Sequence, residues 1–170
     1  HSPRMRFDLV VNTLFKSAMT TGRITVNDPS IWRPLLDIRD TSRAFLTAIE
    51  APESISGVFN VAWGNLQIGE LAVLVRDTLA SLGGVRAEIE TLHRSDNRNY
   101  RVDCSRIREV LGFTPAHNMV STIRSLWEHR HEYGDMERED FYNIRVFKKI
   151  RDQLQVTRLR APEPGLPPGT

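Results

Sequence analysis

Short strand-like segments alternate with amphipathic helical segments along most of this 170-residue chain, and this alternation limits its possible folds more than any other feature. The clearest helical segment covers residues 68–82 and is followed by Gly83-Gly84, a typical helix end. Its apolar face consists of Ile68, Leu71, Ala72, Val75, Leu79 and Leu82. Because helices of this kind bury one face against a sheet, the pattern predicts an α/β fold built from small units.

The other expected elements follow from periodicity and from capping residues. We expect helices over residues 7–20, 41–50, 103–111, 120–127 and 141–156. We expect strands over residues 23–26, 35–38, 57–62 and 85–92. Asp40 is expected to cap the helix over 41–50, and Gly22 and Gly112 to follow helix ends. The proline-rich segment 161–170 is not expected to pack into a core.

Composition excludes several classes of protein. The single cysteine, Cys104, rules out an internal disulfide framework and a thiolate metal cluster. The longest apolar runs are far shorter than the roughly 20 residues that cross a bilayer, and charges interrupt the N-terminal stretch, so we expect neither a membrane span nor a signal peptide. The net charge of +2 is too small to indicate nucleic-acid binding. We therefore expect a soluble, cytoplasmic protein.

Two polar segments carry arginines at the ends of expected strands. Arg33 immediately precedes one strand, and Arg98 lies in the polar loop before the helix at 103. Two arginines on separate loops could clamp a diphosphate through paired, charge-assisted hydrogen bonds. Asp96 could then accept a hydrogen bond from a nucleoside and Tyr100 could stack on it. The alternative is a set of surface ion pairs, such as Asp96 with Arg98.

Four stretches, in this order, resemble the C-terminal, substrate-binding half of extended short-chain dehydrogenase/reductases, the NAD(P)-dependent nucleotide-sugar epimerases and dehydratases. The stretches are Ser-Pro-Arg-Met-Arg-Phe at 2–7 with the helix entry to residue 12, Trp-Arg-Pro-Leu-Leu-Asp-Ile-Arg-Asp at 32–40 with Arg-Ala at 43–44, Phe-Asn-Val at 59–61 with the helix at 70–72, and Asp-Asn-Arg-Asn-Tyr-Arg-Val-Asp at 96–103 ending in Leu-Gly-Phe-Thr-Pro at 111–115.

The resemblance implies roles for particular residues. Arg33 matches the family arginine that contacts the nucleotide diphosphate, and Asp96 and Arg98 match a loop that closes over the nucleotide. The helix entry lines the nucleotide and sugar pocket in such enzymes, which indicates the residues Arg6, Phe7 and Asn12. Asp37 departs from the family, because many relatives have histidine there.

The sequence lacks the two motifs on which the family's hydride chemistry depends. It contains no Gly-x-Gly-x-x-Gly cofactor turn, and none of its three tyrosines is followed by lysine four residues on. The nearest glycine pattern, residues 64–69, is followed by Glu70, whose charge disfavours phosphate. Without the turn and the Tyr-x-x-x-Lys pair we expect no catalysis from these residues alone.

We therefore expect NAD or NADP to be bound by a Rossmann half outside this sequence. The expected organisation is a substrate-binding half over residues 1–132, a helical extension over 133–157 and a tail over 158–170. The expected partners are a nucleotide-diphosphate sugar and either a separate Rossmann half or further copies of the chain. A non-catalytic nucleotide-sugar-binding or protein-interaction module remains the alternative.

Overall fold

A computed structural model describes residues 2, 4–92 and 98–160, with only the backbone described for 155–160. The helices are α1 (Val10–Thr21), α2 (Ile38–Glu50), α3 (Ile68–Ser81), α4 (Ser105–Leu111), α5 (Met119–Glu128) and α6 (Asn143–Arg160), with single 3-10 turns at Arg130–Glu132 and Glu139–Phe141. The strands are β1 (Arg23–Val26), β2 (Trp32–Leu35), β3 (Gly64–Gln67) and β4 (Glu88–Thr91). This mixture confirms the predicted α/β class.

The strands form two small sheets of different kinds. β1 and β4 pair in parallel, from Arg23 opposite Glu88 to Val26 opposite Thr91. β2 and β3 pair antiparallel, with Trp32 opposite Gln67. Along β1 the side chains alternate between exposed and buried, as expected for a strand that has helices on one face only.

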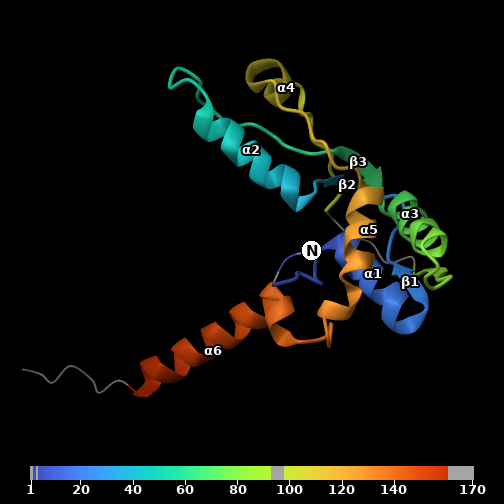
Figure 1. The fold of residues 1–170 in the computed structure, drawn as a ribbon. Helices are drawn as coiled ribbons and strands as arrows, with labels where there is room; N and C mark the ends of the chain where they lie inside the picture. The colour runs from blue at the N-terminus through green and yellow to red at the C-terminus, as the bar shows by residue number, and fades with distance from the viewer. Residues whose placement is uncertain (1, 3, 93–97, 161–170) are drawn as a thin grey trace, which may run out of the picture.

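The core lies where α1, α3 and α5 pack around β1 (Figure 1). Its fully buried side chains include Phe15, Ile24, Leu71, Val75, Leu79 and Ile123. Phe7 joins them, and its ring packs edge-on against Tyr133 and Phe141 with ring centroids 5.5 Å apart in both pairs. The segment after α5 therefore contributes to the same core as the segment before α1.

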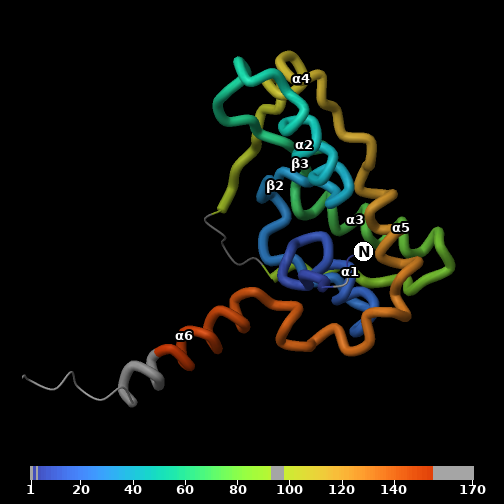
Figure 2. Tube along the Cα trace, turned by 60° about the vertical axis from the view of Figure 1, so that its left-hand side comes forward, coloured from blue at the N-terminus to red at the C-terminus, as the bar shows by residue number. Residues whose placement is uncertain are grey.

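Two groups of elements extend away from this core. α2 and α4 lie together beyond the β2–β3 sheet, and α6 projects in another direction (Figures 1 and 2). Arg106 of α4 holds the chain that follows α2, because its guanidinium donates to the carbonyl oxygens of Ser56 and Val58 at 3.1 and 3.2 Å.

The strand predicted at residues 35–38 is wrong in position, because β2 ends at Leu35. Asp37 caps the following helix: its carboxylate accepts the backbone N–H of Arg39 at 2.9 Å, so α2 begins at Ile38. Asp40, the predicted cap, instead lies in the first turn of α2 and is fully buried.

The strand predicted at residues 57–62 is also wrong. The chain makes its strand later, at Gly64–Gln67, where it can pair with β2. Gly57 has φ of +117°, a backbone conformation outside the strand region, and the preceding residues form a turn. The helices predicted at 7–20, 103–111 and 141–156 are present; they begin two or three residues later than predicted, and their C-terminal ends differ from the prediction by at most four residues.

Candidate functional site

A pocket of about 720 Å³ opens between the start of α1, the chain around β2, the segment after residue 97 and α5. Its volume is within the range of small-molecule sites. Five of the seven predicted site residues line it: Arg6, Asn12, Arg33, Arg98 and Tyr100. Residues that are up to 94 positions apart in the sequence, Arg6 and Tyr100, therefore share one concave surface.

The side of the pocket near β2 carries the two predicted phosphate ligands and an aromatic ring. Arg33 is half-buried in β2, donates from Nη1 to the carbonyl oxygen of Trp32 at 2.9 Å, and lies over the ring of Tyr100 at 5.8 Å from its centroid. Arg98 and Tyr100 are exposed, and Tyr100 exposes 53% of its surface. This arrangement offers guanidinium donors beside an accessible aromatic ring.

The opposite side is formed by the entry to α1. Arg6 makes a two-pronged ion pair with Asp8, at 2.7 and 3.0 Å, and the guanidinium lowers the pKa of the Asp8 carboxyl. Asn12 donates from Nδ2 to the carbonyl oxygen of Arg6 at 2.9 Å, which fixes the turn that presents Arg6. Arg6 therefore faces the pocket as one member of an ion pair with Asp8.

Two predicted site residues are not found in the pocket lining. Phe7 is 1% exposed and packs in the aromatic core described above, so it supports the α1 entry from beneath. Asp96 lies outside the described residues, and its predicted role stays a prediction.

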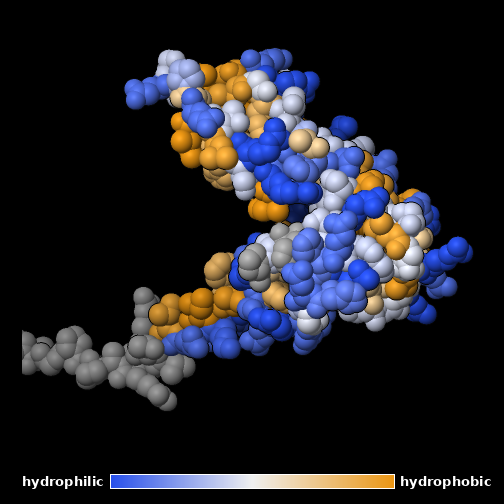
Figure 3. Space-filling view, viewed as in Figure 1, coloured by the Kyte–Doolittle hydropathy of each residue, from blue (hydrophilic) through white to orange (hydrophobic). Residues whose placement is uncertain are grey.

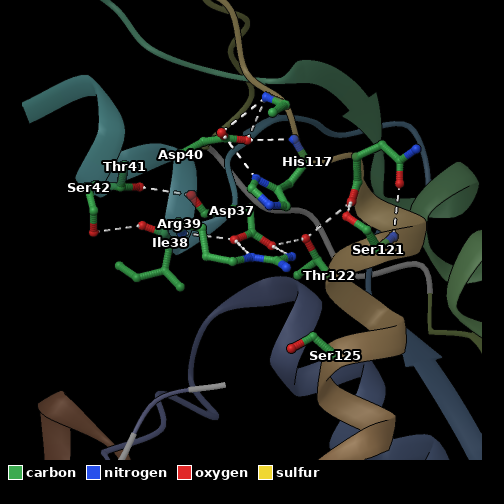
Figure 4. Close-up of polar contacts among 12 residues, drawn as sticks. Asp37, Ile38, Arg39, Asp40, Thr41, Ser42, His117, Ser121, Thr122 and Ser125 are labelled. Carbon is green, nitrogen blue, oxygen red and sulfur yellow. Dashed lines mark hydrogen bonds and ion pairs between the residues drawn. The ribbon is translucent and has the colours of Figure 1, made fainter. Parts of the chain in front are cut away.

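The base of α2 is tied to α5 and to the chain before it by two buried carboxylates, Asp37 and Asp40 (Figure 4). Asp37 accepts from the Arg39 side chain at 2.8 Å and from the Thr122 hydroxyl of α5 at 2.5 Å. Burial opposes its ionisation, but these bonds outweigh burial and hold the pKa of Asp37 well below its ordinary value. Asp37, which departs from the family pattern expected from the sequence, thus serves as a helix cap and as a cross-link to α5.

Asp40 forms the second link. It accepts the backbone N–H of Ala116 at 3.0 Å and of His117 at 2.8 Å, and it pairs with Nη1 of Arg43 at 2.6 Å. The imidazole Nδ1 of His117 lies 3.2 Å away (Figure 4). Burial raises the pKa of Asp40, yet the N–H groups and Arg43 together lower it to about 2.

The glycine pattern at residues 64–69 is not built to hold the phosphates of NAD(P). The glycine pattern ends in the first turn of α3, and a residue of that turn already occupies the helix N-terminus: Glu70 accepts the backbone N–H of Gln67 at 2.8 Å. A Cβ on Gly69 would lie 2.9 Å from Pro29, so this glycine serves close packing rather than approach to a phosphate. Among the residues that the structure describes, no group of His, Cys, Asp and Glu is arranged to hold a metal ion.

Sequence reasoning missed the contacts that hold the Arg98 segment in place. Asn65 of β3 binds both backbone groups of Val102, and Asn99 accepts the backbone N–H of Trp32. These hydrogen bonds join residues that are 37 and 67 positions apart, so no local sequence pattern predicts them.

Solved enzymes with this fold were found by structural comparison. RMD from Pseudomonas aeruginosa, solved with NADPH, is 26% identical and superposes with a TM-score of 0.58 over 74% of this chain and 44% of its own. UDP-glucuronic acid 4-epimerase from Bacillus cereus, solved with UDP-glucuronic acid and NAD, is 20% identical, with a TM-score of 0.63 over 78% and 42%. dTDP-glucose 4,6-dehydratase from Bacillus anthracis is 13% identical, with a TM-score of 0.61 over 85% and 44%.

The chain thus spans about two fifths of the length of these enzymes. No protein-family model and no curated protein matches it. Within the described ranges, no helix is both long and apolar enough to span a membrane. The resemblance expected from the sequence is confirmed at the level of fold: the chain has the fold of part of an extended short-chain dehydrogenase/reductase, the structural family of the NAD-dependent nucleotide-sugar epimerases and dehydratases.

Proposed function

We propose that this chain is the substrate-binding part of a nucleotide-sugar epimerase or dehydratase, and that its pocket holds the nucleoside diphosphate. The observation that carries the proposal is the meeting of Arg33, Arg98 and Tyr100 on one side of a single pocket of about 720 Å³. A similarly folded enzyme was solved with a nucleotide sugar, UDP-glucuronic acid.

The chemistry of that side suits a nucleoside diphosphate. Guanidinium groups form paired, charge-assisted hydrogen bonds with phosphate oxygens. An exposed ring such as Tyr100 supplies a flat surface on which a base stacks, worth roughly 1–3 kcal/mol. On this assignment the sugar contacts Arg6 and Asn12 on the opposite side of the pocket. Holding the sugar in one orientation is this part's contribution to the reaction.

Calorimetric titration with UDP tests this assignment, with uridine as the ligand that lacks phosphate. We expect wild-type chain to bind UDP, and the double variant Arg33→Ala/Arg98→Ala to bind it at least a hundredfold more weakly, since each charge-assisted hydrogen bond contributes roughly 1.5–3 kcal/mol. Uridine affinity should change far less.

The matched control is Arg76→Ala, which removes the same charge from α3 outside the pocket, where Arg76 pairs with its neighbour Asp77. It should bind UDP like the wild type. Equal UDP binding by the double variant and the control would refute the site.

The cofactor and the catalytic pair belong, on this proposal, to a part of the enzyme outside these residues. When bound there, NAD(P) accepts and returns a hydride at the sugar. Adding a separately expressed Rossmann half that carries the glycine-rich turn and Tyr-x-x-x-Lys should restore turnover of a nucleotide sugar. Binding of UDP without any turnover in that mixture would favour the alternative, a non-catalytic nucleotide-sugar-binding module in the cytoplasm.

Exposed apolar side chains favour contact with that other part. On α2, Phe45 and Ile49 are 68% and 77% exposed, and on α6, Ile144 and Phe147 are 78% and 64% exposed. Figure 3 shows apolar surface on both sides of the notch that separates the part of the molecule formed by α2 and α4 from α6. Since faces of this kind seldom stay in water, we assign them to the interface with the Rossmann half.

A further inference from the structure

We propose that Asn65 and Asn99 are positioning residues for the diphosphate, because they fix the chain segment that carries Arg98 and Tyr100 against the β2–β3 sheet. This inference rests on the proposed function and extends it to residues that touch no part of the ligand. The segment in question, residues 98–102, has no strand or helix of its own.

Asn65 replaces a missing strand partner. Its Nδ2 donates to the carbonyl oxygen of Val102 at 3.0 Å, and its Oδ1 accepts the backbone N–H of the same residue at 2.9 Å. Two reciprocal bonds to one residue are the pattern that neighbouring antiparallel strands make through their backbones. One side-chain amide on β3 therefore anchors the far end of the segment.

Asn99 and Arg101 anchor the near end on Trp32 of β2. The Oδ1 of Asn99 accepts the backbone N–H of Trp32 at 3.0 Å, and the guanidinium of Arg101 lies over the Trp32 ring at 4.9 Å from the centroid. A cation over an indole ring is attracted to its negative face. The backbone and the side chain of one tryptophan thus both hold the segment.

The alternation along the segment explains why these anchors matter for binding. Side chains of an extended chain point alternately to opposite sides. Arg98 and Tyr100 line the pocket, whereas Asn99 and Arg101 bind Trp32. Each ligand-facing residue is therefore next to an anchored one, so Arg98 and Tyr100 are held near their bound positions before the ligand arrives. Ordering them in advance removes a cost that binding would otherwise carry.

The test measures UDP affinity in Asn65→Leu and Asn99→Leu. Each hydrogen bond lost corresponds to roughly two- to tenfold in an equilibrium constant, so we expect about a tenfold weaker affinity for UDP in each variant. Asn60→Leu is the matched control, because Asn60 binds just beyond the 98–102 segment: its Nδ2 donates to the carbonyl oxygen of Asp103 at 3.3 Å. It should bind UDP like the wild type.

A positioning role is separated from general damage by repeating the substitutions in an Arg98→Ala/Tyr100→Ala background. There the Asn99→Leu change should weaken UDP binding less than twofold, because the groups it positions are gone. Hydrogen exchange gives a readout without ligand: the amide proton of Val102 should exchange at least tenfold faster in Asn65→Leu.

The possible failures differ. A wild-type chain that binds no UDP overturns the proposed function, and this inference with it. A wild type that binds UDP while both asparagine variants bind it equally well overturns only the positioning role. A full tenfold loss that persists in the Arg98→Ala/Tyr100→Ala background also overturns it, because the damage would then be general.

Discussion

Replacing Asp40 by alanine should destabilise the fold strongly, although this residue lies outside the pocket lining. The carboxylate is fully buried and holds the backbone N–H groups of Ala116 and His117 and the guanidinium of Arg43. Through them it joins the first turn of α2 to the chain that enters α5. Alanine leaves these donors without their acceptor.

The magnitude follows from those contacts. An unsatisfied buried donor costs about 1–3 kcal/mol, and two backbone N–H donors lose their acceptor, whereas the half-exposed Arg43 can turn to water. The overlapping contributions give an expected loss of about 4 kcal/mol for Asp40→Ala, a large share of the 5–15 kcal/mol typical of a folded domain. Asp40→Asn keeps one oxygen acceptor and should lose roughly half as much.

Urea unfolding, followed by circular dichroism, measures this loss. With a slope of about 2 kcal/mol per molar urea, the midpoint of Asp40→Ala should fall by about 2 M. Asp77→Ala is the control, since it removes an exposed carboxylate of α3 that pairs with its neighbour Arg76. Midpoints that agree for Asp40→Ala and the control would refute the reasoning.

Three further results are expected. The free energy of unfolding should be at its full value above about pH 4 and fall between pH 4 and pH 2. The reason is that folding lowers the pKa of Asp40 from 3.8 to about 2 and also lowers the pKa of Asp37. The loss from Asp40 alone should be about 2 kcal/mol, measured by urea unfolding at a series of pH values. Gly22→Ala should cost about 1–2 kcal/mol in the same assay, because Gly22 has φ of +68° and the added Cβ meets no atom within 4 Å, leaving only backbone strain. In the isolated chain no Rossmann half covers the α2 face, so copies should associate through it; Phe45→Asp/Ile49→Asp should then reduce self-association in sedimentation velocity without lowering the melting temperature, and a lower melting temperature would contradict the exposed α2 face.

The sequence predicted best those elements whose signals are local. α3 was expected from its apolar periodicity and the following glycines, and it runs from Ile68 to Ser81. The start of α2 was not, because Asp37 and Asp40 are equally suitable caps by residue type. The choice depends on contacts of Asp40 with residues 76 and 77 positions away, which sequence periodicity does not report.

The candidate site also combines residues that local sequence signals predict with residues that they do not. Residue type and family resemblance predict Arg33, Arg98 and Tyr100 as site residues, and the fold brings these three to one pocket. The amide of Asn65 that holds Val102 has no local signature. Nor does periodicity show that the apolar side chains of α2 face solvent in this chain, because helical spacing indicates an apolar face without indicating what covers it.

The most direct test of the central claim is the effect of UDP on the arginine side-chain resonances of the isotope-labelled chain. Arg33 and Arg98 should show large, saturable shifts of their Nε–H signals, because charge-assisted bonds to phosphate change the environment of that group. Arg76, outside the pocket, should not move. Shifts confined to other arginines, or no shift at millimolar UDP, would contradict the assignment of this pocket to a nucleoside diphosphate.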